Sequence, residues 1–160
     1  MDTHRIVVDS YFDGRVHRNS GPYTITLRDG AIAAIENGDR APAGAATLRA
    51  AFLMPGLVEA HSHLFLDGGE LDLAKRAAYL SAPRWEMMAV ARRSLAQSLA
   101  AGVTLIRDAG DIHGVNLQLR RELQTAAPPQ PDLRCAGKAM RKAGRYGSFM
   151  AREVTDEIGV

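Results

Sequence analysis

The sequence contains a single cysteine, no long apolar run and almost no excess charge, and each shortage excludes a class of protein. One cysteine, Cys135, excludes an internal disulfide framework. The apolar run at residues 6–8 is no signal-peptide core, and no later run approaches the roughly 20 residues of a membrane span. A net charge of +2 is too small to indicate a nucleic-acid partner. We therefore expect no membrane and no nucleic-acid partner, and a reducing, cytoplasmic setting.

The composition that remains is that of a folded protein. Hydrophobic residues make up 46% of the sequence and charged residues 24%, as in globular domains. A length of 160 residues suits one ordinary domain and is short for two. Because the pattern of elements changes near residue 54, we expect two partial domains, residues 1–53 and residues 54–160.

The first part, residues 1–53, predicts short strands and turns. The Asp29-Gly30 pair offers the positive φ angle that a tight hairpin turn requires. Gly, Pro and Ala crowd residues 37–46, which predicts a loop. The predicted strands cover residues 5–12, 23–27, 31–36 and 47–52. Such a small sheet with unpaired edges does not suit an independent domain.

The second part, residues 54–160, alternates strand and helix patterns. A helix beginning near Pro83 has an apolar stripe of Met88, Ala91, Leu95 and Leu99, and Gly102 follows where a helix C-cap is expected. A loop over 65–82 is long enough to be functional or to contain a short helix. The predicted strands are 57–64, 103–108 and 132–136, and further helices are predicted over 116–126 and from 154–158.

Strands that alternate with helices predict a parallel α/β sheet built from βα units. About three units are visible, whereas a closed eight-stranded barrel needs about 250 residues. A small doubly wound sheet over residues 54–160 is the alternative fold. It is disfavoured because neither early strand is followed by a glycine-rich phosphate loop.

Two histidines two residues apart are the strongest chemical signal. In a strand, His61 and His63 project to the same face, and so does Glu59. Two imidazoles and a carboxylate make a poor core surface and a reasonable metal surface, because imidazole is the commonest metal ligand. Glu59 could accept a hydrogen bond from the second ring nitrogen of a ligating imidazole.

Two motifs resemble those of a known family. Residues 55–63, Pro-Gly-Leu-Val-Glu-Ala-His-Ser-His, resemble the first-strand signature of the amidohydrolase superfamily, Pro-Gly-x-x-Asp-x-His-x-His. Residues 102–108 resemble the second-strand signature Gly-Val-Thr-Thr-x-Arg-Asp of its imidazolonepropionase-like and prolidase-like branches. The strands before residue 53 resemble the small β-sandwich that accompanies these barrels. One departure is Glu59, where the family has Asp.

The resemblance implies the N-terminal part of a (β/α)8 TIM-type barrel, preceded by β-sandwich strands. It implies a metal-dependent hydrolase that cleaves an amide, cyclic amide or related C–N bond of a small-molecule substrate with a metal-activated water. His61 and His63 would be ligands of a divalent metal, one or two ions in a complete enzyme. We expect zinc, with iron, manganese and nickel as alternatives. The general base and the other ligands are expected beyond residue 160.

Other polar residues have both a site reading and an ordinary one. Asp108 lies at the end of the predicted second strand, where it could support the metal ligands or contact the substrate, or could be a structural cap or pair with Arg107 or another neighbour. His113, in the loop that follows, could be a ligand or a substrate contact, or a solvated loop residue. Lys138 lies one strand early for a metal-bridging lysine, and Cys135 predicts an inert buried thiol. A basic cluster could meet an anionic substrate or simply be solvated, and Tyr146 and Phe149 within it could line a pocket or pack. The cluster comprises Lys138, Arg141, Lys142, Arg145 and Arg152.

Two functions follow from this reading. The first is the amidohydrolase, present here as an N-terminal fragment that is inactive alone because two imidazoles do not complete a catalytic zinc site. The alternative is a non-catalytic remnant or partial subunit. A parallel sheet left open at its edges also predicts self-association or pairing with a complementary C-terminal chain.

Overall fold

The computed structural model describes residues 3–43, 46–125 and 129–155, and the chain falls into two compact units. Unit 1 is Met1–Pro55 and unit 2 is Gly56–Val160. Their division lies close to the boundary expected between residues 53 and 54. Each unit has a hydrophobic core of its own.

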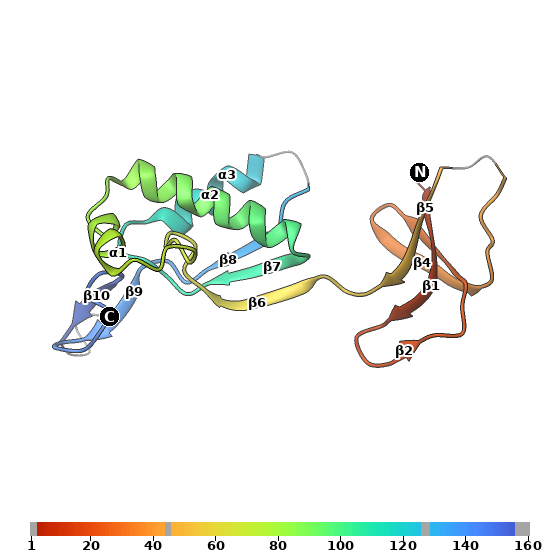
Figure 1. The fold of residues 1–160 in the computed structure, drawn as a ribbon, viewed down its shortest axis with the longest axis horizontal. Helices are drawn as coiled ribbons and strands as arrows, with labels where there is room; N and C mark the ends of the chain where they lie inside the picture. Colours follow the sequence, from red (N-terminus) through yellow and green to blue (C-terminus); the bar gives the residue numbers. More distant parts are fainter. Residues whose placement is uncertain (1–2, 44–45, 126–128, 156–160) are drawn as a thin grey trace. The chain divides into compact units, whose positions relative to one another are not determined.

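Unit 1 is a five-stranded sheet (Figure 1). Its strands are β1 (Thr3–Phe12), β2 (His17–Arg18), β3 (Tyr23–Arg28), β4 (Ala31–Asn37) and β5 (Thr47–Leu53). Strand β1 pairs antiparallel with β2 and β3 and parallel with β5. The β3–β4 hairpin turns at Asp29 and Gly30, with φ angles of 50° and 79° as predicted. Four predicted strands are confirmed, and β2 was missed because only two residues pair with the end of β1.

Unit 2 contains a parallel sheet in the order β6-β7-β8 and a separate pair of short parallel strands. Its elements are β6 (Leu57–Ser62), α1 (Leu73–Tyr79), α2 (Arg84–Ala100), β7 (Val103–Asp108), α3 (Val115–Thr125), β8 (Asp132–Cys135), β9 (Ala139–Lys142) and β10 (Ala151–Val154). The predicted alternation of parallel strands and helices is confirmed from β6 to β8, after which β9 and β10 follow with no helix between them in the described residues.

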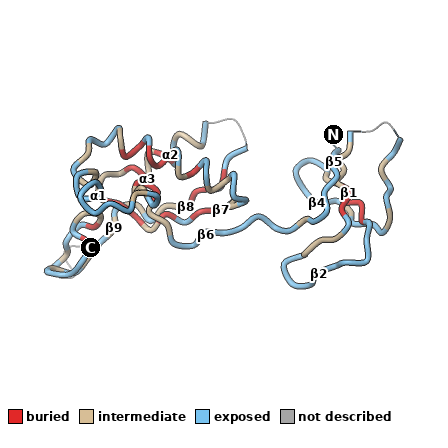
Figure 2. The backbone as a smooth tube through the Cα atoms, viewed as in Figure 1, coloured by how far each residue is buried: buried red, intermediate tan, exposed pale blue. Residues whose placement is uncertain are grey.

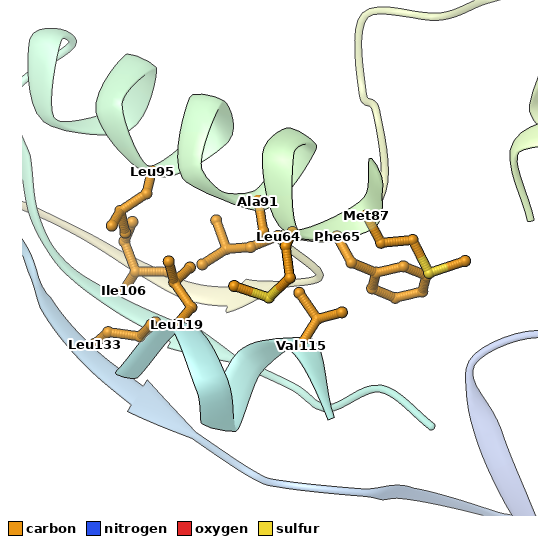
Figure 3. Packing of buried hydrophobic residues seen from close by; sticks show 10 residues of the cluster. Leu64, Phe65, Met87, Ala91, Leu95, Ile106, Val115, Leu119 and Leu133 are labelled. Carbon is orange, nitrogen blue, oxygen red and sulfur yellow. The ribbon is translucent and has the colours of Figure 1, made fainter. Parts of the chain in front are cut away.

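Helices α2 and α3 pack on one face of the parallel sheet (Figures 1 and 3). Their apolar side chains meet those of the strands in one core cluster, which contains Leu64, Phe65, Met87, Met88, Ala91, Leu95, Ile106, Val115, Leu119 and Leu133. The predicted stripe of α2 faces this core, although Leu99 is only half-buried. Helix α2 starts after Pro83 and is followed by Gly102 at φ 85°, which agrees with the predicted start and cap.

Strand β6 is the exposed edge of this sheet. Leu57 and Val58 are adjacent in sequence and yet are 46% and 62% exposed, so neither face of the strand is covered (Figure 2). Within the described ranges, no helix has both the length and the apolar character that a membrane crossing requires.

Three predictions about unit 2 need correction or completion. The first strand ends at Ser62 rather than at Leu64. The long loop over 65–82 contains the short helix α1. The prediction of a helix over residues 154–158 is wrong at Val154, because this residue pairs with Lys142 in the β9–β10 ladder. Residues 156–158 of that prediction lie outside the described part of the chain.

Candidate metal centre

The two histidines lie where the first parallel strand ends. Strands β6 and β7 end in register, with Ser62 opposite Asp108, and the Ala109 N–H continues the ladder to the Ser62 carbonyl at 2.8 Å. A register shift between Glu59 and Ser62 interrupts the strand's regular alternation. The imidazole rings are nevertheless adjacent, with centroids 5.4 Å apart and planes at 76°. The structure thus brings His61 and His63 together at the carboxyl end of the sheet.

One nitrogen of His63 is already engaged by the protein. Its Nδ1 lies 2.8 Å from the carbonyl oxygen of Gly110, in the loop after β7. Because a carbonyl only accepts hydrogen bonds, Nδ1 must be the donor. In the neutral ring, the proton on Nδ1 leaves the lone pair on Nε2, which is the state that binds a metal.

Glu59 has a different contact from the one expected. Its Oε1 accepts the backbone N–H of His61 at 2.8 Å, and the residue is exposed. The acceptor for an imidazole of the pair is the Gly110 main-chain carbonyl. The Glu59 carboxylate therefore fixes the backbone of His61.

Asp108 is a buried cap that ties together several loops, with its side chain 1% exposed. Its Oδ2 accepts the Leu64 N–H at 2.9 Å, and its Oδ1 accepts the Gly110 N–H at 2.8 Å. Asn116 donates its Nδ2 to the same Oδ1 at 3.0 Å. Of the alternatives open from the sequence, these contacts match the structural cap. One of the capped N–H groups belongs to Leu64, the residue after His63.

Asp111 and Asn116 complete a buried polar network that sequence reasoning missed. Asp111 accepts the N–H groups of Val115 and Asn116 at the start of α3, at 3.1 and 2.9 Å. Asn116 reaches the Gly137 carbonyl at 2.9 Å, after β8. The sequence did contain a signal for Asp111, because an aspartate just before a predicted helix commonly accepts the free N–H groups of the first helical turn.

The other predicted site residues lie apart from the histidine pair. The His113 ring packs on Phe65 with centroids 5.6 Å apart, and its Nε2 is buried without a hydrogen-bond partner in the described structure. Lys138 is exposed just before β9. Across the described residues, no group of three or more His, Cys, Asp or Glu side chains is placed to hold a metal.

The fit of a metal to this site is therefore partial. His61 and His63 are adjacent and His63 has a defined tautomer, which suits two positions of a coordination sphere. A catalytic zinc takes three protein ligands and a water. The adjacent imidazoles of His61 and His63 could fill two of these three positions, and the described residues place no third His, Cys, Asp or Glu beside them as a ligand.

A cavity of about 470 Å³ opens beside His63. Its walls are mostly apolar and come from the loop after β6, from α1 and from the β9–β10 connection; they include Leu66, Leu73, Leu80, Tyr146, Phe149 and Met150. Tyr146 and Phe149 meet edge to face, with ring centroids 5.5 Å apart. Of the two roles considered for Tyr146 and Phe149 from the sequence, the structure therefore shows the lining of a pocket. The volume lies in the range of small-molecule sites.

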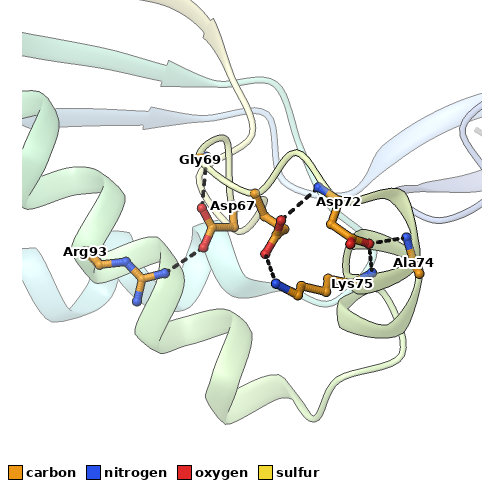
Figure 4. Close-up of polar contacts among 7 residues, drawn as sticks. Asp67, Gly69, Asp72, Ala74, Lys75 and Arg93 are labelled. Carbon is orange, nitrogen blue, oxygen red and sulfur yellow. Dashed lines mark hydrogen bonds and ion pairs between the residues drawn. The ribbon is translucent and has the colours of Figure 1, made fainter.

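Charged groups at the cavity are mostly neutralised by neighbours. Asp67 pairs with Arg93 at 2.9 Å, and Glu70 lies 3.8 Å from Lys75 and accepts the Asp72 N–H (Figure 4). Among the described residues, no ion pair or side-chain hydrogen bond engages the guanidinium of Arg76, which also lines the cavity. The cavity thus combines an apolar wall with one available positive charge.

Tyr79 is one of the residues that line the cavity. Its hydroxyl donates to the carbonyl of Phe65. Burial raises the pKa of Tyr79 to about 12, and the carboxylates of Glu86 and Asp67 act in the same direction. The hydroxyl therefore stays protonated at neutral pH and remains a hydrogen-bond donor.

Four members of the basic cluster, Lys138, Lys142, Arg145 and Arg152, are exposed, and Arg141 is engaged within the fold. Arg141 lies in β9 with its side chain 17% exposed, pairs with Glu153 at 2.6 Å and donates to the Arg145 carbonyl at 2.8 Å. These contacts join the β9–β10 ladder across the strands. Cys135, predicted as an inert buried thiol, is half-buried at the end of β8.

Comparison with solved structures finds the fold of this chain within several larger enzyme structures. An amidohydrolase crystal structure matches with a TM-score of 0.72 and 17% identity, covering 99% of this chain and 42% of that one. An ochratoxinase of A. niger matches at 0.70 and 18%, covering 98% and 42%. A Xaa-Pro dipeptidase with methionine bound in its active site matches at 0.68 and 18%, covering 87% and 34%.

These matches concern the fold, since sequence comparison adds nothing to them. No family model matches the sequence, and no curated protein is significantly similar to it. The chain spans between 34 and 42% of the length of those three structures. It therefore has the fold of a portion of amidohydrolase and dipeptidase structures.

Proposed function

We propose that this chain contributes the first metal ligands and one wall of the substrate cavity to a metal-dependent amidohydrolase. The adjacent imidazoles of His61 and His63 at the carboxyl end of β6 are the observation that carries the proposal. The shared fold with an amidohydrolase and a Xaa-Pro dipeptidase supports it. The proposed setting is a TIM-type barrel of which β6, β7 and β8 are three neighbouring strands.

In this proposal His61 and His63 hold a divalent ion, with zinc first among the candidates. A bound ion of this kind polarises the carbonyl of an amide and lowers the pKa of a water molecule. The chain's own residues orient the ligands: Gly110 fixes the His63 ring and Glu59 fixes the His61 backbone. The general base comes from outside the described residues.

The cavity beside His63 supports a substrate with an apolar or aromatic group. The side chains of Leu66, Phe149 and Met150 offer an apolar surface within it. Arg76 adds a positive charge that favours an anionic substituent over a cationic one. The scissile bond proposed is an amide, a cyclic amide or a related C–N bond.

A second candidate is a non-catalytic remnant or partial subunit that pairs with another chain. The observation that favours it is the incomplete ligand set among the described residues. The two candidates differ in what the chain does with zinc and in whether a complementary chain restores hydrolysis.

Zinc titration of the 15N-histidine-labelled chain tests the ligand assignment. We expect zinc to shift the ring-nitrogen signals of His61 and His63 and to leave His17, in unit 1, unchanged. His61→Ala and His63→Ala should each abolish the response, whereas His17→Ala should keep it. A response centred on another histidine would overturn the assignment.

The same chain should not retain zinc through dialysis against metal-free buffer, because two imidazoles make a weak site. It should also not hydrolyse amides by itself. Metal analysis that finds one tightly held zinc per chain, lost in His61→Ala, would contradict this expectation.

A further inference from the structure

We infer that Asp108 is a positioning residue that sets the tautomer and the orientation of the His63 ring. The inference rests on the proposed function for its purpose, since a ring with a free Nε2 serves a metal. The geometry behind it is independent of any metal. It consists of hydrogen bonds that one buried carboxylate accepts from the main chain of two loops, one beside His63 and one that contains its acceptor, Gly110.

The first restraint acts on the main chain beside His63. The Leu64 N–H donates to Asp108 Oδ2 at 2.9 Å, one residue after the histidine. The side chain of Leu64 is 3% exposed and belongs to the core cluster. The backbone next to His63 is therefore held in two ways. The Leu64 N–H makes a charge-assisted hydrogen bond to Asp108, and the Leu64 side chain packs in the core.

The second restraint acts on the acceptor of the His63 proton. The Gly110 N–H donates to Asp108 Oδ1 at 2.8 Å, and the carbonyl of the same residue accepts from His63 Nδ1 at 2.8 Å. Gly110 has φ 112°, and a Cβ there would lie 2.9 Å from the Ala139 nitrogen of β9. The carbonyl is thus fixed by Asp108 and by close packing against Ala139.

Both oxygens of Asp108 are needed for this arrangement. Oδ2 serves the residue after His63, and Oδ1 serves the residue that accepts its proton. An asparagine at this position keeps the shape but replaces one acceptor oxygen with an NH2 donor. Either the Leu64 N–H or the Gly110 N–H then loses its acceptor, and the enclosure of the ring loosens.

Asp111 offers a matched comparison within the same network. It is 0% exposed and Asp108 is 1% exposed, and each accepts three hydrogen bonds. The partners of Asp111 are His113, Val115 and Asn116, so its carboxylate holds the start of α3. In the described part of the chain, its carboxylate accepts no hydrogen bond from the Leu64 or Gly110 N–H. Replacing it should disturb stability without reaching the His63 ring.

The experiment records long-range 1H–15N spectra of histidine rings in the metal-free chain at pH 8.5, where imidazoles of ordinary pKa are neutral. In the wild-type chain, His63 should show a protonated Nδ1 and an unprotonated Nε2. In Asp108→Asn, a mixture of tautomers or the Nε2–H form should replace it. In Asp111→Asn, the Nδ1–H form should persist, although thermal stability falls as in Asp108→Asn.

Two results would overturn the inference. One is a wild-type His63 in the Nε2–H form, which needs no variant and so decides the matter even if Asp108→Asn fails to fold. The other is a folded Asp108→Asn chain whose His63 tautomer matches that of Asp111→Asn.

A zinc titration of the same variants separates this inference from the proposed function. Loss of such a support for a ligating histidine lowers metal affinity by about 10–100-fold. We expect Asp108→Asn to show this loss and Asp111→Asn to bind as the wild type does. If zinc ignores His61 and His63 altogether, the proposed function fails, while the tautomer result still stands on its own.

Discussion

Cys135 shows how burial and neighbouring carboxylates together act on the pKa of a thiol. Its Sγ lies 3.3 Å from the Asn116 carbonyl, and burial raises the pKa of the thiol to about 11. The carboxylates of Asp108 and Asp111 act in the same direction. An unperturbed thiol has a pKa of about 8.5, so the folded chain disfavours the thiolate at ordinary pH.

We predict that iodoacetamide alkylates Cys135 at pH 8 on the order of a hundredfold more slowly in the native chain than in urea, because the thiolate is scarcer. Mass spectrometry of timed samples measures the alkylation rate. Equal rates in the native and unfolded chain would contradict the prediction.

The raised pKa of Cys135 also makes the stability of the fold depend on pH. The contribution of Cys135 to the free energy of unfolding is complete below about pH 8.5 and is lost as the pH rises toward about 11.

Among single residues, the sequence predicted that His61 and His63 lie together, but it did not predict which main-chain groups contact them. His61 and His63 stand out because their spacing matches the two-residue period of a strand. The Gly110 carbonyl that orients His63 gives no side-chain signal. The sequence allowed Glu59 to accept from an imidazole, and its carboxylate instead accepts the backbone N–H of His61, which the sequence could not distinguish.

At the scale of elements, a close approach between the start of β6 and β7 joins the two sequence motifs. A Cβ at Gly56 would lie 2.7 Å from the Thr104 Cβ and closer still to its Oγ1 and Cγ2. Rotation of Thr104 can move the outer atoms but not the Cβ. The Leu57 N–H also donates to the Gly102 carbonyl at 2.9 Å. Glycine at 56 therefore permits the strands to pair from their first residues.

We predict that Gly56→Ala lowers the free energy of unfolding of unit 2 by about 1–3 kcal/mol, the usual cost of overpacking. Gly68→Ala is the control, because nothing lies within 4 Å of a Cβ there. Adding Thr104→Gly to Gly56→Ala should recover part of the loss. Urea denaturation followed by circular dichroism measures each variant, and equal stability of the two alanine variants would refute the steric argument.

Elements with a strong apolar pattern were predicted closely, and short charged ones were missed. Residues 103–108 form β7 as expected, since three of the six are apolar and two of these three are β-branched. Strands β9 and β10, Ala-Met-Arg-Lys and Ala-Arg-Glu-Val, have no clear alternation. Their pairing depends on contacts such as Arg141 with Glu153, which link distant parts of the sequence.

At the scale of the whole molecule, the uncovered edge strand β6 predicts association. An edge with free main-chain groups and exposed apolar residues is a template for another chain. We predict that sedimentation velocity shows species heavier than the 17.3 kDa monomer. Pairing with a second copy or with a complementary chain is the proposed outcome, and a monodisperse monomer would count against it.

A matched pair of variants localises this association. Val58 on β6 is 62% exposed and Ile32 in unit 1 is 63% exposed. A lysine on an edge strand opposes pairing because its charge would be buried. Val58→Lys should therefore reduce the heavier species, whereas Ile32→Lys should leave them. The reverse result would move the association surface to unit 1.

The Gly110 carbonyl has a consequence for redesign of the loop after β7. Because a main-chain oxygen orients His63, the neighbouring side chains at Ala109 and Ile112 are not required for that contact. A combinatorial library could randomise these two positions to reshape the rim of the sheet. Gly110 itself must stay fixed, because of its positive φ and its packing against Ala139.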